Sequence, residues 1–327
     1  MTGVDERSIR AIESSDTDEL IRIVDGYAAS RSWDAMVKVR ERCEEAVTRG
    51  KQVWGVSEYI RYRLALDAPG EWAGPAVGMG PSRFTLGPLP EVAASKKTWA
   101  ELEAHLPEGP ERAMTAHERV VRGERLEHAS LNRLVLELPL ELQVWEPEYP
   151  VATYKPDRVD APTPRGPRFP AGQPVGEGRA DSGDADGARA LGALVEHWEE
   201  TSNGRVEVSS AEGDADSALG ALGVSRAALV SVTFPEAMAW MAWAAASGGA
   251  HGRRRGAAAG RFNAWWAASE LAGLEWPPDP GELGEAGAEL RWFLWSDGSP
   301  DTGWALRLAV SSPAEGLSWA LNAIDAD

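Results

Sequence analysis

The sequence predicts an α+β protein in which a helical N-terminal part is joined by a Pro-rich connector to a Trp-rich C-terminal part. Apolar residues recur at spacings of three and four through roughly the first 125 residues, which is typical of amphipathic helices. Proline, glycine and charged residues then dominate Pro147 to Gly187. Ten of the fifteen tryptophans lie beyond residue 188. We therefore expect a helical domain at 1–130, an edge strand and flexible connector at 131–187, and an α+β domain at 188–327.

In the N-terminal part the clearest helix is expected between Ser32 and Gly50. Its apolar residues Met36, Val39 and Cys43 share one face. Gly50 then supplies a helix stop. Short connections between the expected helices favour antiparallel packing of neighbours. A helical bundle and a short helical solenoid both satisfy this pattern, and the sequence leaves the two open.

The middle of the chain predicts one strand and then an extended segment. Residues 131–145 alternate apolar and polar side chains, which indicates a strand, and Pro139 within it favours the edge of a sheet. The following segment, 147–187, contains too few apolar residues to offset the entropy of ordering its backbone. We expect it to be extended and to end in a flexible stretch.

The C-terminal part predicts a helical hairpin and a β-hairpin. Pro235 fits the first turn of one helix, and Gly248 and Gly249 fit its end before a second helix at 257–271. The loop at 298–301 separates two strand-like runs. The remaining expected elements are helices at 188–200, 216–222 and 317–324 and a strand at 205–208.

Composition limits the possible partners and compartments. The chain has 51 acidic and 33 basic residues and a net charge of -18, which argues against extensive binding of duplex nucleic acid, because that binding depends on neutralising phosphates. Cys43 is the single cysteine, so an intramolecular disulfide is excluded. The longest apolar run, 237–246, is too short to span a bilayer. We expect a cytoplasmic protein with no membrane contact.

The bend between the two C-terminal helices is the candidate ligand site. Glycines there allow the backbone to approach a ligand closely, and guanidinium groups bind phosphate and carboxylate oxygens in a forked geometry. An anionic small molecule, a nucleotide or single-stranded nucleic acid would fit this chemistry. The alternative is that these arginines pair with the protein's own carboxylates. The expected ligand-binding residues are His251, Arg253, Arg254, Arg255, Arg261 and Trp265.

No catalytic motif accompanies this bend. The glycine-rich phosphate loops, the G-x-S-x-G elbow and the H-E-x-x-H zinc pattern are missing from the sequence. Cys43 lies on an apolar helix face, where a thiol is usually inert. We expect no metal site and no cofactor, and we leave the catalytic residues unknown. The favoured function is a non-catalytic interaction or scaffold protein with a protein partner, and the alternative is binding of the anionic ligand, with or without catalysis.

Two C-terminal segments carry a family resemblance. Residues 247–266 read SGGAHGRRRGAAAGRFNAWW, and residues 291–323 read RWFLWSDGSPDTGWALRLAVSSPAEGLSWALNA. They resemble a family of uncharacterised actinobacterial proteins described as a domain of unknown function. The resemblance implies a bacterial, cytosolic setting and transfers no catalytic residue.

Overall fold

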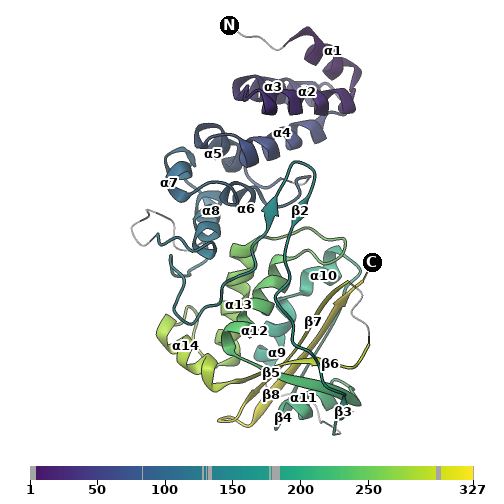
Figure 1. Cartoon of the computed structure of the whole chain (residues 1–327), viewed down its shortest axis with the longest axis vertical. Coiled ribbons are helices and arrows are strands. Elements are labelled where there is room, and N and C mark those ends of the chain that lie inside the picture. Colours follow the sequence, from purple (N-terminus) through teal and green to yellow (C-terminus); the bar gives the residue numbers. More distant parts are fainter. Residues whose placement is uncertain are drawn as a thin grey trace. The chain divides into compact units, whose positions relative to one another are not determined.

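The computed structural model describes residues 5–82, 84–126, 129, 131, 135–176, 178, 185–299 and 303–326. It confirms the predicted α+β class, with helices first and an antiparallel sheet in the C-terminal part (Figure 1). The chain forms two compact units. The helical unit consists of Met1–Arg119, His128–Val135 and Ala152–Ala161, and the sheet unit of Val120–Glu127, Leu136–Val151 and Pro162–Asp327. The predicted boundaries at residues 130 and 187 stay predictions.

The helical unit is a succession of helices with a short two-stranded ribbon. Polar side chains begin the first two helices: the Asp5 carboxylate accepts a hydrogen bond from the Ser8 backbone N–H, and the Asp16 carboxylate does the same for Glu19. The elements are α1 (Glu6–Ser14), α2 (Thr17–Ala29), α3 (Trp33–Thr48), α4 (Trp54–Asp67), α5 (Gly70–Gly78), α6 (Leu89–Ala94), α7 (Trp99–Leu102), the 3₁₀ turn η1 (Glu103–His105), α8 (Pro110–Val121), β1 (Thr153–Tyr154) and β2 (Val159–Asp160).

The core of the helical unit follows the predicted apolar face of α3. Met36, Val39 and Cys43 are fully buried, and they pack with apolar residues of α1, α2 and α4 in one cluster. Gly50, with φ +86°, lies just after α3 ends, where a left-handed residue is needed to turn the chain. The spacing of apolar residues was therefore sufficient to predict this helix and its buried face.

The sheet unit contains a six-stranded antiparallel sheet in the order β3-β5-β6-β7-β8-β4. The predicted helical hairpin and β-hairpin are confirmed as α12 with α13 and as β6 with β7. The elements are β3 (Gln173–Pro174), α9 (Ala185–Ala193), α10 (Glu196–Thr201), β4 (Arg205–Glu212), α11 (Ala215–Ala221), β5 (Arg226–Val232), α12 (Phe234–Ala246), α13 (Ala257–Leu271), α14 (Pro280–Glu289), β6 (Arg291–Ser296), β7 (Trp304–Ser312) and β8 (Leu317–Asp325).

Helices pack on both faces of this sheet because β6 is apolar on both sides. Trp292 stacks on Phe234 of α12, with ring centroids 5.4 Å apart. Phe293 and Trp295 point to the opposite face and pack in the cluster that contains α11. A strand buried on both faces reads as a continuous apolar run rather than as a strict alternation.

The expected closing helix at 317–324 is wrong. These residues form β8, which pairs with β7 on one side and with β4 on the other. The short run Leu317 to Ile324 is apolar enough for a helix or a strand. Hydrogen bonding to a strand on each side stabilises the strand. The strand β5 was not predicted, and the expected helix at 188–200 is divided into α9 and α10.

The expected strand at 131–145 is also wrong for the residues described there, 131 and 135–145, which form turns and irregular backbone. Leu136 and Leu138 are buried as the alternation predicts, Leu140 is buried as well, and Leu134, the third residue of the predicted alternation, lies outside the described residues. Their segment joins no ladder because two of its carbonyl groups, those of Pro139 and Glu141, accept hydrogen bonds from a buried arginine side chain instead.

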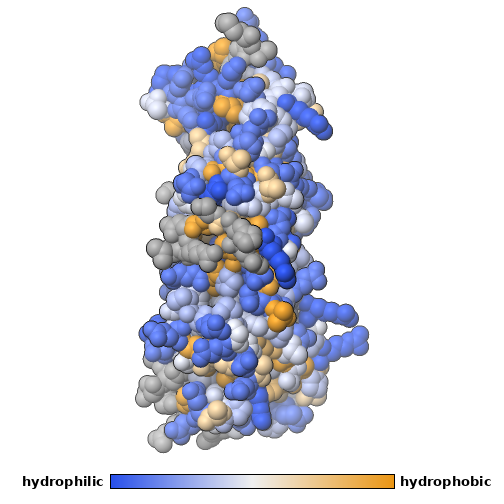
Figure 2. All heavy atoms as spheres, turned by 90° about the vertical axis from the view of Figure 1, so that its left-hand side faces the viewer, coloured by the Kyte–Doolittle hydropathy of each residue, from blue (hydrophilic) through white to orange (hydrophobic). Residues whose placement is uncertain are grey.

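The Pro-rich connector contains no helix between residues 147 and 176 and contributes the short strands β1, β2 and β3, whereas its last residues, 185–187, already belong to α9. Residues 177 and 179–184, half of the stretch 175–188 expected to be flexible, lie outside the described residues. No helix in the described part of the chain is long and apolar enough to cross a membrane. The face of the protein in Figure 2 is mainly hydrophilic, with small separate groups of hydrophobic residues.

Candidate functional site

The arginine bend lies between α12 and α13, as expected. Gly256, with φ +98°, precedes the first residue of α13. The turn is tight: a Cβ atom on Gly248 would lie 2.3 Å from the carbonyl oxygen of Gly252. On the bend the side chains of His251, Arg253 and Arg255 are exposed, whereas Arg254 is half-buried. The structure therefore keeps these four predicted residues together on one turn of chain.

Internal contacts hold this bend. Arg255 Nη1 lies 3.3 Å from Nδ1 of His197 on α10, and the other ring nitrogen of His197 donates to the Ser247 carbonyl oxygen at 2.6 Å. Burial, with the Arg255 charge adding to it, lowers the pKa of His197 to about 4. The imidazole is therefore neutral at pH 7. The Asp325 carboxylate, at the end of β8, accepts a hydrogen bond from the Ala250 N–H at 2.7 Å.

Arg261 and Trp265 lie in a different environment, around the carboxylate of Glu146. Arg261 donates to Glu146 through Nε and Nη2, both at 2.7 Å, and its remaining bonds go to the Pro139 and Glu141 carbonyl oxygens. Trp265 Nε1 donates to the same carboxylate at 3.1 Å. The side chains of Arg261 and Glu146 are both 0% exposed.

The geometry of Arg261 and Trp265 around Glu146 indicates a structural role for this group. A forked, fully enclosed arginine–carboxylate pair leaves no guanidinium edge for an outside anion. The six predicted site residues are thus divided between the exposed bend and the core. Sequence reasoning missed Glu146, which lies 115 residues before Arg261, because no local pattern links two residues at that separation. Anion binding by the residues of the bend stays a prediction.

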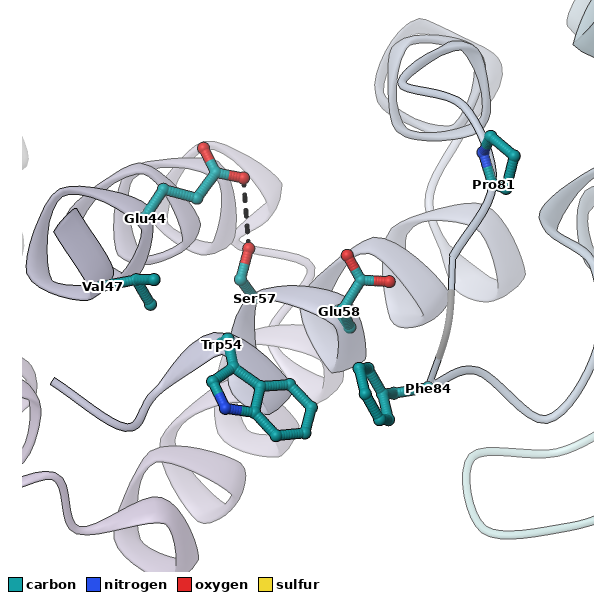
Figure 3. A pocket seen from close by; sticks show the side chains of 7 residues that line it. All are labelled: Glu44, Val47, Trp54, Ser57, Glu58, Pro81 and Phe84. Atoms are coloured by element: carbon teal, nitrogen blue, oxygen red, sulfur yellow. Dashed lines mark hydrogen bonds between the residues drawn. The ribbon is translucent and has the colours of Figure 1, made fainter. Parts of the chain in front are cut away.

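A pocket of about 440 Å³ in the helical unit is a second candidate (Figure 3). Two exposed aromatic rings mark it: Trp54, the first residue of α4, is 43% exposed, and Phe84 is 58% exposed. Their ring centroids are 4.1 Å apart at an interplanar angle of 46°. The residues lining the pocket are Glu44 and Val47 of α3, Trp54, Ser57 and Glu58 of α4, and Pro81 and Phe84 of the segment between α5 and α6.

The segment that carries Phe84 is fastened to α4 by polar contacts. Arg61 of α4 donates to the Gly80 carbonyl oxygen at 2.5 Å and to the Ala76 carbonyl oxygen. It also donates to Glu58 at 3.1 Å, and Glu58 accepts a further hydrogen bond from Ser82. These contacts fix the backbone before Phe84, so its ring is placed beside Trp54 by the fold and not by burial of the ring itself.

Two carboxylates share the pocket wall with the rings. Oε1 of Glu44 accepts a hydrogen bond from Ser57 at 3.1 Å and lies 3.6 Å from Nη1 of Arg40. Its Oε2 makes no hydrogen bond with the part of the chain that is described. The Glu44 side chain is 47% exposed and that of Glu58 is 21% exposed. The pocket therefore offers an apolar wall and accessible carboxylate oxygens at the same place.

Two buried groups of the helical unit also have shifted pKa values. Burial raises the pKa of Cys43 to about 12, so its thiol stays protonated. Burial lowers the pKa of Lys97 to about 8, and its Nζ donates to the Ala65 and Leu66 carbonyl oxygens at the end of α4. Among the residues described, no three His, Cys, Asp or Glu side chains are grouped so that they could hold a metal ion.

Sequence reasoning did not single out this pocket. The available signal was weak: Phe84 is an aromatic residue in a Gly- and Pro-rich stretch, 78–88, where apolar burial is hard to achieve. Trp54 stands at the start of a helix, where a side chain can lie outside the packed face. Neither feature shows that Glu44 lines the same pocket, since this depends on the packing of α3 against α4.

The chain belongs to a family of unknown function, DUF6183, whose model matches residues 18–327. This confirms the resemblance to a domain of unknown function, and the match covers most of the helical unit as well as the C-terminal segments. Comparison with curated proteins and with solved structures gave no significant match.

Proposed function

We propose that this protein is a non-catalytic interaction protein whose helical unit binds a segment of a partner protein in the Trp54–Phe84 pocket. The observation that supports this proposal is the exposed ring pair over a hollow of about 440 Å³. Large aromatic side chains are enriched at the centres of protein interfaces, where a partner covers them.

The energetics favour an occupant that covers both rings. An aromatic side chain buries about 150–250 Å² when enclosed, and each square ångström contributes about 25 cal/mol. Covering the exposed parts of Trp54 and Phe84 is then worth on the order of 5 kcal/mol before the entropy of association is subtracted. A further contact is needed for a stable complex, and the carboxylates beside the rings can provide it.

The partner is a protein segment and not a nucleic acid in this proposal. The net charge of -18 and the carboxylates of Glu44 and Glu58 repel phosphates. We place the protein in the cytoplasm of an actinobacterium. A single cysteine, fully buried and protonated, fits a reducing compartment.

Selection from a random peptide library displayed on phage, with the purified full chain as target, tests this function. We expect enriched peptides whose binding weakens at least about tenfold in Trp54→Ala and in Phe84→Ala, because truncating a central aromatic residue typically has an effect of this size. Leu86→Ala is the matched control, since Leu86 is also 40% exposed and belongs to the same segment but does not line the pocket.

The control should change the dissociation constant less than about twofold, and circular dichroism should show that each variant keeps its helical content. The proposal fails if no peptide is enriched, or if the enriched peptides bind the two aromatic variants as tightly as the unmodified chain.

A further inference from the structure

We infer that the side chain seated in the Trp54–Phe84 pocket is a lysine or arginine of the partner. This inference rests on the proposed function, because it specifies the occupant of the same pocket. It follows from three features of the wall: its apolar surface, its carboxylates and the positions of the arginines beneath them.

The apolar part of the wall fits a long aliphatic stem. The rings of Trp54 and Phe84 lie side by side, and Val47 and Pro81 complete the apolar lining (Figure 3). Lysine and arginine bury their methylene stems against apolar surface while the charged group remains near polar partners. Their cationic groups also bind favourably to the face of an aromatic ring, with tryptophan the strongest partner.

The carboxylates select against other occupants. A purely apolar side chain would displace water from Glu44 and Glu58 and return no hydrogen bond, which is unfavourable for a charged group. An acidic side chain would be repelled. A cation can bind Oε2 of Glu44, because the Glu44 side chain is 47% exposed and this oxygen makes no hydrogen bond with the described part of the chain.

The protein's own arginines contact these carboxylates without lining the pocket, so a cation from a partner can enter it. Arg40 and Arg61 contact Glu44 and Glu58, but their side chains are only 11% and 7% exposed, and neither lines the pocket. Arg61 is held by the carbonyl oxygens of Ala76 and Gly80. These arginines stay inside the fold, whereas Glu44 and Glu58 line the pocket.

A double-mutant cycle on the enriched peptides tests this inference. We expect a shared lysine or arginine in the selected sequences. Replacing that residue with leucine should weaken binding at least about tenfold, because both the carboxylate and the ring contacts of the cation are lost. Glu44→Gln should weaken binding of the parent peptide about fivefold and leave binding of the leucine peptide nearly unchanged.

Glu45→Gln is the matched control. Glu45 lies on the same helix, its side chain is 57% exposed, and it does not line the pocket. We expect it to change binding of either peptide less than about twofold, since exposed and distant charges are screened. Glu58 is left intact in this test because it also holds Ser82.

The results separate the inference from the function on which it rests. Peptides that depend on Trp54 and Phe84 but carry leucine or phenylalanine at the buried position, with no effect of Glu44→Gln, would overturn the inference and leave protein binding intact. Peptides with a shared lysine or arginine and a coupled loss with Glu44→Gln would support it.

Discussion

An aromatic pair in the helical unit and an aromatic cluster in the sheet unit differ in their exposure to solvent. In the helical unit, Trp54 and Phe84 contact each other and remain about half exposed. In the sheet unit, the tryptophan N–H groups of a closed cluster all donate to protein acceptors, at 2.8 to 3.1 Å. The closed cluster consists of Trp145, Phe234, Trp265 and Trp292, with neighbouring ring centroids 5.0 to 5.4 Å apart.

This difference shows that tryptophan content alone does not indicate a binding surface. A ring whose N–H is bonded and whose faces are covered stabilises the fold. A ring held in place by its backbone and left open to solvent is available to a partner. The same distinction separates Arg261, which is enclosed with Glu146, from Glu44, whose side chain is 47% exposed and lines the same pocket as the open rings.

The largest effect is expected for Glu146→Ala in the sheet unit. The substitution leaves the buried Arg261 guanidinium without its counter-ion, and removing one partner of a buried ion pair typically reduces the free energy of unfolding by about 3 to 5 kcal/mol. Urea denaturation followed by circular dichroism measures the loss. Glu148→Ala, an exposed residue two positions later, should change it by less than about 0.5 kcal/mol. Equal effects of the two substitutions would show that Glu146 is not central to the core.

Phe234→Ala tests the closed cluster itself. Phe234 is 4% exposed and lies between the rings of Trp145 and Trp292. Deleting its ring opens a cavity, and we expect a loss of about 3 kcal/mol in the free energy of unfolding. The measurement is again urea denaturation. A loss below about 1 kcal/mol would mean that the cluster can repack, and the contrast with the open pair would disappear.

The neutral His197 makes the sheet unit sensitive to acid. Its pKa is about 4 in the fold and 6.5 in its ordinary state. Between these values the unfolded chain binds more protons, so stability falls as the pH is lowered from above 6.5 towards 4, by roughly 1 to 3 kcal/mol.

His197→Gln should reduce this slope, whereas His251→Gln, at an exposed position on the bend, should leave it unchanged. Thermal denaturation between pH 4 and pH 7 measures the effect. Identical slopes in the parent protein and in His197→Gln would refute the assignment.

The smallest effect on stability is expected for Phe84→Ala. Its ring is 58% exposed, and its segment is held by Arg61 and Glu58 rather than by the ring. We expect a change of less than about 0.5 kcal/mol in the free energy of unfolding, together with the loss of peptide binding described above. A destabilisation near that of Phe234→Ala would show that the open pair is part of the core.

Local patterns were sufficient for several elements whose contacts are close in sequence. The apolar face of α3, the hairpin of α12 and α13 and the hairpin of β6 and β7 follow from spacing, glycines and a turn. The segment 317–324 was assigned wrongly although its hairpin partner β7 ends at Ser312, because its apolar run also suits a helix and its second partner, β4, lies more than 100 residues earlier. Long-range pairing of this kind leaves no signal in a short window.

The same physical reason limits what could be known of the sites. The sequence by itself determined the α+β class, the acidic surface and the position of the arginine bend, because these follow from composition and near neighbours. Only the tertiary structure decided that Arg261 is enclosed by Glu146, and that Trp54, Phe84 and Glu44 meet around one pocket. These side chains come from separate segments of the chain, and the packing of those segments determines which side chains lie together.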